Sequence, residues 1–139
     1  KLRLELRPLL RGRGHAILDA YNASPQSMQA GLDFLAKSAP RGRRLAVLGS
    51  MLELGTASPA LHRALGRSAR QQGLRSIAAL GPFAKAIAAG FGAGAKAFSR
   101  DEAVAAARWI SSGLKPGDWV LFKGSRGMAV ERVYQAMGA

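Results

Sequence analysis

Short apolar runs alternate along this chain with longer segments whose apolar residues recur at helical spacing. The runs are continuous rather than alternating, which is typical of strands that helices cover on both faces. Strands that alternate with helices in this way predict a three-layer α/β fold with a mostly parallel sheet. The predicted strands span residues 16–18, 45–48, 77–80, 95–98 and 119–122.

The first segment differs from this pattern. Residues 2–6 alternate strictly between leucine and a charged residue, which is the period of a half-exposed strand. We expect this strand at an edge of the sheet, antiparallel to its neighbour. We expect Pro8 and residues 11–14 to form the turn that follows it.

Serines followed by helix-favouring residues mark several predicted helix starts. Ser24 and Ser58 each precede a proline, and a capping serine followed by proline suits the first turn of a helix. Ser99 and Glu102 have the spacing of a capping box at the start of another helix. One further helix is predicted to begin at Pro82. The last helix is predicted to carry Val130, Val133 and Met137 on its apolar face.

The composition fits one folded domain. The chain has 139 residues, 48% of them hydrophobic, which suffices for a sizeable core and excludes a disordered tail. It has no cysteine and two histidines, so disulfides, thiolate metal sites and a zinc site made by histidines alone are excluded. Because the chain begins with Lys1 rather than methionine, we expect it to be a piece of a longer protein.

The charge is strongly positive. The formal net charge is +13, from 21 Lys and Arg against 8 Asp and Glu. Such an excess indicates either a nucleic-acid or acidic partner, or simply a basic surface. The two dense basic groups, residues 7–13 and 41–44, contain no aromatic side chains that could stack on bases. We therefore favour the basic surface and do not expect nucleic acid as a partner.

Polar residues and glycines follow most of the predicted strands. In open α/β sheets, ligands bind beyond the carboxyl ends of the strands. These ends carry residues 19–22, 49–51, 81 and 123–127. We therefore expect the polar loops to gather on one rim of the sheet, which is the candidate site.

The sharpest candidate is the loop Lys123-Gly124-Ser125-Arg126. Its glycine would let the backbone approach a ligand, and Arg126 could bind a carboxylate or phosphate through two hydrogen bonds. The same residues also fit a glycine-rich turn whose Lys and Arg face water. The motif alone favours neither interpretation.

Three other ionisable residues stand next to strands or loops. Asp19 could accept ribose hydroxyls or hold a metal-bound water, although aspartate in such a place more often caps a turn. Glu53 could act as an acid or a base, and His62 fits a surface or capping role near a helix start. The chain has no P-loop sequence, G-x-x-x-x-G-K-[ST], and so no ATPase machinery of its own.

Three strings carry a resemblance to a known family: DAYNASPQSM (19–28), VLGSMLELG (47–55) and VLFKGSRGMAVERV (120–133). They resemble the patterns D-[ST]-Y-N-A-N-P-x-S-M, L-G-D-M-L-E-L-G and V-K-G-S-R-x-M of the Mur ligase family, in the C-terminal domain of its MurF members. The order and spacing agree, and the match covers nearly the whole chain. His62 also falls where the family often has a histidine.

The resemblance implies that residues 1–139 form a Rossmann-like C-terminal domain, without the UDP-binding and central ATPase domains of the family. MurF ligases join D-alanyl-D-alanine to UDP-N-acetylmuramoyl-tripeptide in bacterial peptidoglycan precursor synthesis. ATP activates the tripeptide carboxylate as an acyl phosphate, and the central domain holds ATP and Mg²⁺. The resemblance therefore implies these substrates and the other two domains as partners, a cytoplasmic location and no membrane partner. The isolated domain is expected to be inactive.

The resemblance also implies residue roles. It gives Asp19, Tyr21 and Asn22 a nucleotide-binding role. A dipeptide-binding role falls to Asn22, Lys123, Gly124, Ser125 and Arg126. A second, weaker loop contains Met51, Glu53 and His62. No catalytic residue and no metal ligand is expected in this domain.

Four positions depart from the family pattern. Ser50 stands where the family has aspartate, and Ser24 stands where it has asparagine. Leu18 and Ala20 replace positions beside Asp19 that are commonly polar. Two alternatives stay open beside this interpretation. One is a basic nucleic-acid-binding α/β module, and the other is the corresponding domain of another Mur or folylpolyglutamate-type ligase, against which the KGSR and YNASP strings argue.

Overall fold

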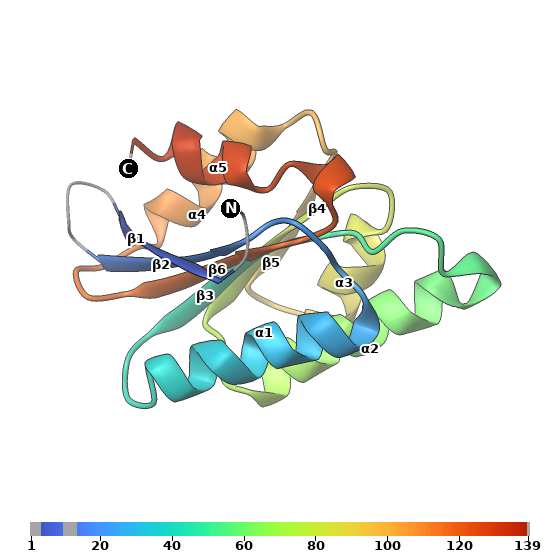
Figure 1. Cartoon of the computed structure of the whole chain (residues 1–139), viewed down its shortest axis with the longest axis horizontal. Helices are drawn as coiled ribbons and strands as arrows, with labels where there is room; N and C mark the ends of the chain where they lie inside the picture. Colours follow the sequence, from blue (N-terminus) through green and yellow to red (C-terminus); the bar gives the residue numbers. More distant parts are fainter. Residues whose placement is uncertain (1–3, 10–13, 139) are drawn as a thin grey trace.

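The computed structural model describes residues 4–9 and 14–138 of the chain. Six strands form one sheet in the order β1-β2-β6-β3-β4-β5 (Figure 1). β1 is antiparallel to β2, and all other neighbouring strands are parallel. The strands are β1 (Glu5–Leu9), β2 (Gly14–Asp19), β3 (Arg44–Gly49), β4 (Ser76–Leu80), β5 (Ala95–Phe98) and β6 (Trp119–Lys123). The predicted α/β fold and its antiparallel edge strand are confirmed.

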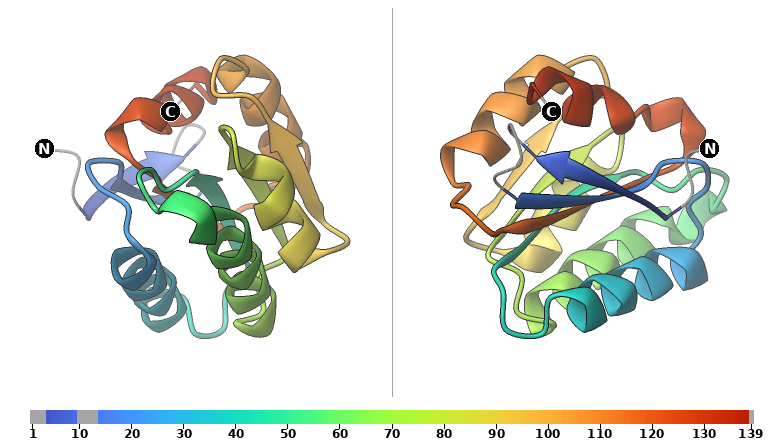
Figure 2. Two further views of the ribbon diagram at one scale, coloured as in Figure 1. Left: turned by 90° about the vertical axis from the view of Figure 1, so that its right-hand side faces the viewer. Right: turned by 60° about the vertical axis from the view of Figure 1, so that its left-hand side comes forward.

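Helices cover both faces of the sheet (Figures 1 and 2). One face carries α1 (Pro25–Ser38), α2 (Ser58–Gln71) and α3 (Ala84–Phe91). The other face carries α4 (Ala103–Ser112) and α5 (Glu131–Ala136). Two short 3₁₀ turns, η2 (Gly55–Ala57) and η3 (Arg126–Met128), lie in the connections after β3 and β6.

The core therefore has two halves, one on each face of the sheet. In β6, Leu121 joins the apolar cluster under α1, α2 and α3, whereas Val120 and Phe122 join the cluster under α4 and α5. Successive side chains of a strand point to opposite faces, so a strand covered on both sides needs apolar residues at every position. This explains the continuous apolar runs in the sequence.

β6, the last strand in the sequence, lies between β2 and β3. The register pairs Lys123 of β6 with Asp19 of β2 and with Leu48 of β3. The loop after β6 therefore emerges between the loop after β2 and the loop after β3, and the three sequence motifs meet at one rim of the sheet.

The edge strand begins and ends later than the pattern predicted. Pro8 is part of β1, opposite His15, and Gly14 is the first residue of β2, so the prediction that these two residues belong to a turn is wrong. Proline is tolerated on an edge strand because its missing N–H can face away from the sheet. Residues 2 and 3 of the predicted strand, and residues 11–13 of the predicted turn, lie outside the described residues.

The three serine signals have different outcomes. Ser24 caps α1 as predicted: its hydroxyl accepts from Ser27 N–H at 3.1 Å, and Ser27 Oγ accepts from Ser24 N–H at 2.8 Å. Ser58 is instead the first residue of α2 and makes no side-chain cap. Ser99 and Glu102 form only half of a capping box, because Glu102 accepts from Ser99 N–H but α4 begins at Ala103.

Candidate functional site

Three of the four predicted strand-end loops lie side by side, because β2, β6 and β3 are neighbours in the sheet. They are residues 19–22 after β2, 49–51 after β3 and 123–127 after β6. The fourth strand end, at Gly81, follows β4 and adjoins the loop after β3. The expectation that the polar strand ends gather on one rim is confirmed.

Lys123 and Asp19 form an ion pair at the base of this rim. Lys123 Nζ donates to Asp19 Oδ2 over 2.6 Å and to the backbone oxygen of Asn22 over 3.2 Å. The Lys123 side chain is only 3% exposed. Lys123 is the last residue of β6, so the prediction that it belongs to the loop after the strand is wrong. A charged amine is stable there because its partners replace the water it has lost.

Gly124 is required by packing within the chain. A Cβ atom built on Gly124 would lie 2.8 Å from Gly49 Cα and 3.0 Å from Gly49 N. Only glycine lets the ends of β6 and β3 approach so closely. The close backbone approach predicted at this glycine therefore exists, but its neighbour is another strand end.

The next two residues of the loop lie nearer to solvent. Ser125 is half-buried, and its hydroxyl donates to the Ser50 backbone oxygen at 3.2 Å. Arg126 is exposed, and its guanidinium carbon lies 5.3 Å from the centroid of the Tyr21 ring. This distance permits a cation–π contact. Ser125 and Arg126 thus connect the loop after β6 to both neighbouring loops.

His62 is buried and fixes the loop after β3. Its Nε2 accepts from Met51 N–H at 2.8 Å, and its Nδ1 lies 2.6 Å from the Ser58 backbone oxygen. The ring also stacks on Phe83, with centroids 4.6 Å apart. Burial lowers the pKa of His62, partly opposed by the bond to Ser58. The expectation of a surface or capping histidine is therefore wrong.

Ser50, at the position where the family pattern has aspartate, joins two loops. Its hydroxyl donates to Leu80 O at 2.9 Å and accepts from Phe83 N–H at 3.0 Å. The residue is fully buried, so its hydroxyl serves the connection between the ends of β3 and β4. Sequence reasoning missed this role, although a serine directly after a buried strand was a usable signal. Glu53, further along the loop, is exposed and has a φ of 62°.

A cleft of about 280 Å³ opens beside the ion pair. Leu4, Asp19, Asn22, Ser27 and Lys123 line it. Leu4 and Ser27 were not among the predicted site residues. Ser27 comes from the first turn of α1, and Leu4 precedes the edge strand, so no local motif marked either one.

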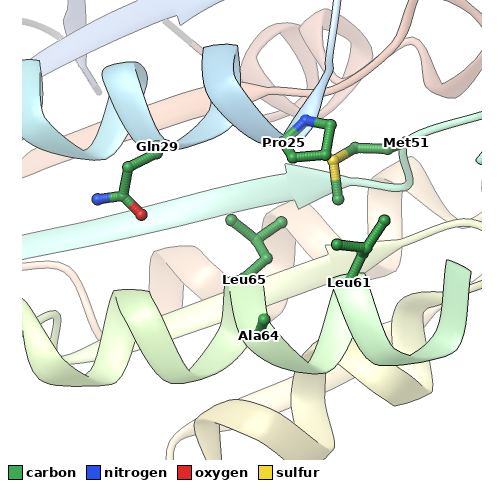
Figure 3. Close-up of a pocket in the computed structure, with 6 residues that line it drawn as sticks. All are labelled: Pro25, Gln29, Met51, Leu61, Ala64 and Leu65. Atoms are coloured by element: carbon green, nitrogen blue, oxygen red, sulfur yellow. The ribbon is translucent and has the colours of Figure 1, made fainter. Parts of the chain in front are cut away.

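A second pocket, of about 180 Å³, lies between α1 and α2 (Figure 3). Its lining is mainly apolar: Pro25, Gln29, Met51, Leu61, Ala64 and Leu65. The Met51 side chain reaches into the space between the two helices, so this side chain lines the second pocket and not the ion-pair cleft (Figure 3). Gln29 accepts from Ser68 and donates to Asp33, which occupies its polar groups.

The rim carries groups that could bind and orient a ligand: cations, a hydroxyl, an amide and one carboxylate. Among residues 4–9 and 14–138, no three His, Cys, Asp or Glu side chains lie close enough to hold a metal ion. Within the same residues, no helix has the length and apolar character needed to cross a membrane. A phosphate, a carboxylate or a sugar hydroxyl is the ligand chemistry that these groups suit.

Comparison with known proteins identifies a family that this chain matches. The family described as "Mur ligase, glutamate ligase domain" matches residues 3–126. A UDP-N-acetylmuramoyl-tripeptide–D-alanyl-D-alanine ligase of Synechocystis is 40% identical over 126 residues, which are 88% of this chain and 27% of that protein. The chain thus spans about a quarter of the length of this relative.

Solved structures give the same result. MurF ligase from Thermotoga maritima, in complex with ADP, superposes with a TM-score of 0.81 at 29% identity and covers 98% of this chain and 30% of its own. A MurF structure from Acinetobacter baumannii superposes with a TM-score of 0.84 at 32% identity and covers 100% of this chain and 31% of its own. The chain belongs to the Mur ligase family and corresponds to the C-terminal domain of these enzymes, with MurF ligases among its relatives.

Proposed function

We propose that the chain is the C-terminal domain of a bacterial ligase that uses ATP to join D-alanyl-D-alanine to UDP-N-acetylmuramoyl-tripeptide. The reaction would serve peptidoglycan precursor synthesis in the cytoplasm. One observation carries the proposal: the three motifs that resemble MurF converge on one rim, around a cleft lined by Asp19, Asn22 and Lys123. The name of the Synechocystis relative supports the choice of reaction.

Asp19, Tyr21 and Asn22 form the proposed nucleotide side of the site. One oxygen of Asp19 is held by Lys123, and its Oδ1 accepts no hydrogen bond from the part of the chain that the structure describes. The Asp19 side chain is 13% exposed, and it lines the cleft. A carboxylate oxygen so placed suits the hydroxyl of a ribose. ATP and Mg²⁺ would be held mainly by the central domain of the ligase, which this chain lacks.

Ser125 and Arg126 form the proposed dipeptide side, together with Asn22. Arg126 is the exposed cation of the loop, and its guanidinium carbon lies 5.3 Å from the centroid of the Tyr21 ring. Guanidinium binds a carboxylate through two parallel hydrogen bonds. Arg126 would therefore hold the dipeptide carboxylate and orient the amine, a contribution of position rather than of proton transfer.

The isolated chain should not catalyse the ligase reaction or hydrolyse ATP. Its sequence contains no P-loop, so the phosphates of ATP have no cradle in it. The binding sites for the substrates would be complete only when the three domains of the ligase close together. Hydrolysis of ATP by the purified chain, above the rate of a no-protein control, would contradict this part of the proposal.

An NMR titration of the chain with D-alanyl-D-alanine tests the proposed site, with L-alanyl-L-alanine as the control. We expect shifts of the backbone amides of Asn22, Ser125 and Arg126 that the control dipeptide does not produce. Equal shifts with both dipeptides, or shifts confined to other parts of the chain, would contradict the assignment. If the chain shows no shifts, the same titration in the complete ligase must show them for the proposal to stand.

A further inference from the structure

We propose that Lys123 is a positioning residue: it holds Asp19 and the Asn22 backbone in place for the ligand and does not contact the ligand itself. The inference rests on the function proposed above. It separates Lys123 from Ser125 and Arg126, although the four residues 123–126 form one continuous string in the sequence.

The contacts of the amine support this role. Lys123 Nζ donates to Asp19 Oδ2 and to Asn22 O, so it joins β6 to two points of the loop after β2. Asp19 is also its register partner in the parallel β2–β6 pair. The amine therefore fixes both the direction of the Asp19 carboxylate and the path of the chain that carries Tyr21 and Asn22.

The path of the side chain leads through the protein interior. A Cβ atom built on Gly31 of α1 would lie 2.7 Å from Lys123 Cδ and 3.4 Å from Cε. Gly31 is a buried residue inside a helix, where glycine is less favourable than alanine. The space left by the absent side chain is filled by the lysine stem. Lys123 is thus enclosed by α1 on one side and its two hydrogen-bond partners at the tip.

The electrostatics of the site also favour this role. ATP and the tripeptide substrate both bring negative charge to the rim, and an unpaired Asp19 carboxylate would repel them. Paired with Lys123, the carboxylate contributes almost no net charge, while its other oxygen can still accept a hydrogen bond. The amine gives two of its three N–H donors to these partners, and the Lys123 side chain is only 3% exposed, so little of it can meet a ligand where it stands. Moving the amine toward a ligand would weaken its pairing with the mostly buried Asp19 carboxylate, which is strongly unfavourable.

A double-mutant cycle in the complete ligase tests the inference. Lys123→Met keeps the length of the stem and removes the amine, and Asp19→Asn removes the charge of its partner. We expect each single variant to raise KM for ATP about tenfold, as losing one charged hydrogen bond predicts. We expect KM for D-alanyl-D-alanine to stay within about twofold, because the bond to Asn22 is the longer one and goes to its backbone oxygen, and because the contacts of Ser125 and Arg126 do not involve Lys123. We expect the double variant to match Asp19→Asn, because Lys123 acts through Asp19.

Other patterns of KM overturn the inference. If Lys123→Met raises KM for the dipeptide tenfold, and this loss adds to that of Asp19→Asn, then Lys123 contacts the dipeptide. If Lys123→Met alone does not fold, the double variant replaces it, because the double variant buries no unpaired charge. The double variant is then compared with Asp19→Asn. A higher KM for the dipeptide in the double variant overturns the inference. If Asp19→Asn leaves KM for ATP unchanged, the nucleotide role proposed for Asp19 fails as well.

Discussion

Met51 donates its backbone N–H to Nε2 of the buried His62 over 2.8 Å, and this bond ties the loop after β3 to α2. Nε2 can accept only if it carries no proton. Nδ1 must then carry the proton and donate to Ser58 O, 2.6 Å away. The two bonds together select the neutral ring with its proton on Nδ1. A helix side chain thus determines the conformation of a loop at the candidate site.

Replacing His62 with leucine should destabilise the fold. The variant fills a similar volume but leaves the buried Met51 N–H without its acceptor, and it removes the side-chain bond to Ser58 O, an oxygen that lies within α2. A buried donor without a partner costs about 1–3 kcal/mol, so we expect a loss of about that size in urea unfolding. Arg67→Ala, on an exposed position of the same helix, is the control and should stay within about 0.5 kcal/mol of the parent.

The lowered pKa of His62 predicts a pH dependence of stability. In the unfolded chain the ring takes up a proton below pH 6.5, its ordinary pKa, whereas the folded ring resists protonation down to its lower pKa. The contribution of His62 is therefore complete above pH 6.5 and is lost as the pH falls below it. The slope is at most about 1.4 kcal/mol per pH unit.

Unfolding by urea at pH 7.5, 6.5 and 5.5 would measure this dependence. We expect the parent to lose stability over this range more steeply than His62→Leu, which has no group to titrate at this position. Parallel curves for the two proteins would show that His62 does not carry the pH dependence.

Gly66 and Gly90 hold α2 and α3 at a close distance. A Cβ on Gly90 would lie 2.0 Å from Arg63 O, and a Cβ on Gly66 would lie 2.0 Å from Ile87 O. Gly90→Ala should therefore force the helices apart and cost about 1–3 kcal/mol or more in chemical unfolding. Gly113→Ala is the matched control: its φ is −99° and the nearest atom to a Cβ is 3.9 Å away, so we expect no loss of stability. A mild effect of Gly90→Ala would contradict the close packing.

The strand ends could be predicted from the sequence because burial on both faces demands continuous apolar runs. The rim of polar loops could be predicted from the same apolar runs, because the carboxyl ends of parallel strands lie at the same edge of the sheet. The position of β6 between β2 and β3 could not be predicted, because strand order depends on which helices share a face. That order alone brings Lys123 beside Asp19.

The wrong predictions concern residues whose role depends on distant partners. Lys123 looked like a loop cation because a charged residue at the end of an apolar run usually faces water, and its partner Asp19 is far away in sequence. His62 was predicted to be a surface residue because the sequence alone does not reveal its contacts with Met51 and Phe83. The capping serine at Ser24 could be predicted because its partner, Ser27, is only three residues away.

The positive charge is unevenly distributed in the fold. No acidic residue occurs between Leu54 and Arg100, in the part of the chain that forms α2, β4, α3 and β5. The basic residues of this part are all exposed: Arg63, Arg67, Arg70, Arg75, Lys85, Lys96 and Arg100. The exposed large apolar residues of the described chain all lie outside this part, so it offers no exposed aromatic ring for stacking on bases.

This surface predicts weak, salt-sensitive DNA binding without sequence preference. With about four phosphates contacted, the affinity for a duplex should fall about 100-fold between roughly 50 and 200 mM salt. Fluorescence anisotropy with two unrelated duplexes measures this, and Arg63→Gln with Arg67→Gln should reduce the salt slope by about two. Lys37→Gln, on α1, is a control for general charge. Binding that persists at physiological salt with a preference for one duplex would instead support the nucleic-acid-binding alternative.

Steady-state kinetics of Arg126→Ala in the complete ligase tests the central claim most directly. Arg126 is exposed, so its loss should not affect folding, and Arg132→Ala on α5 is the matched control with no expected effect. Losing a charged hydrogen bond of about 1.5–3 kcal/mol predicts a KM for D-alanyl-D-alanine that is about 10- to 100-fold higher, with KM for ATP unchanged. A raised KM for ATP with an unchanged KM for the dipeptide would contradict the proposed site.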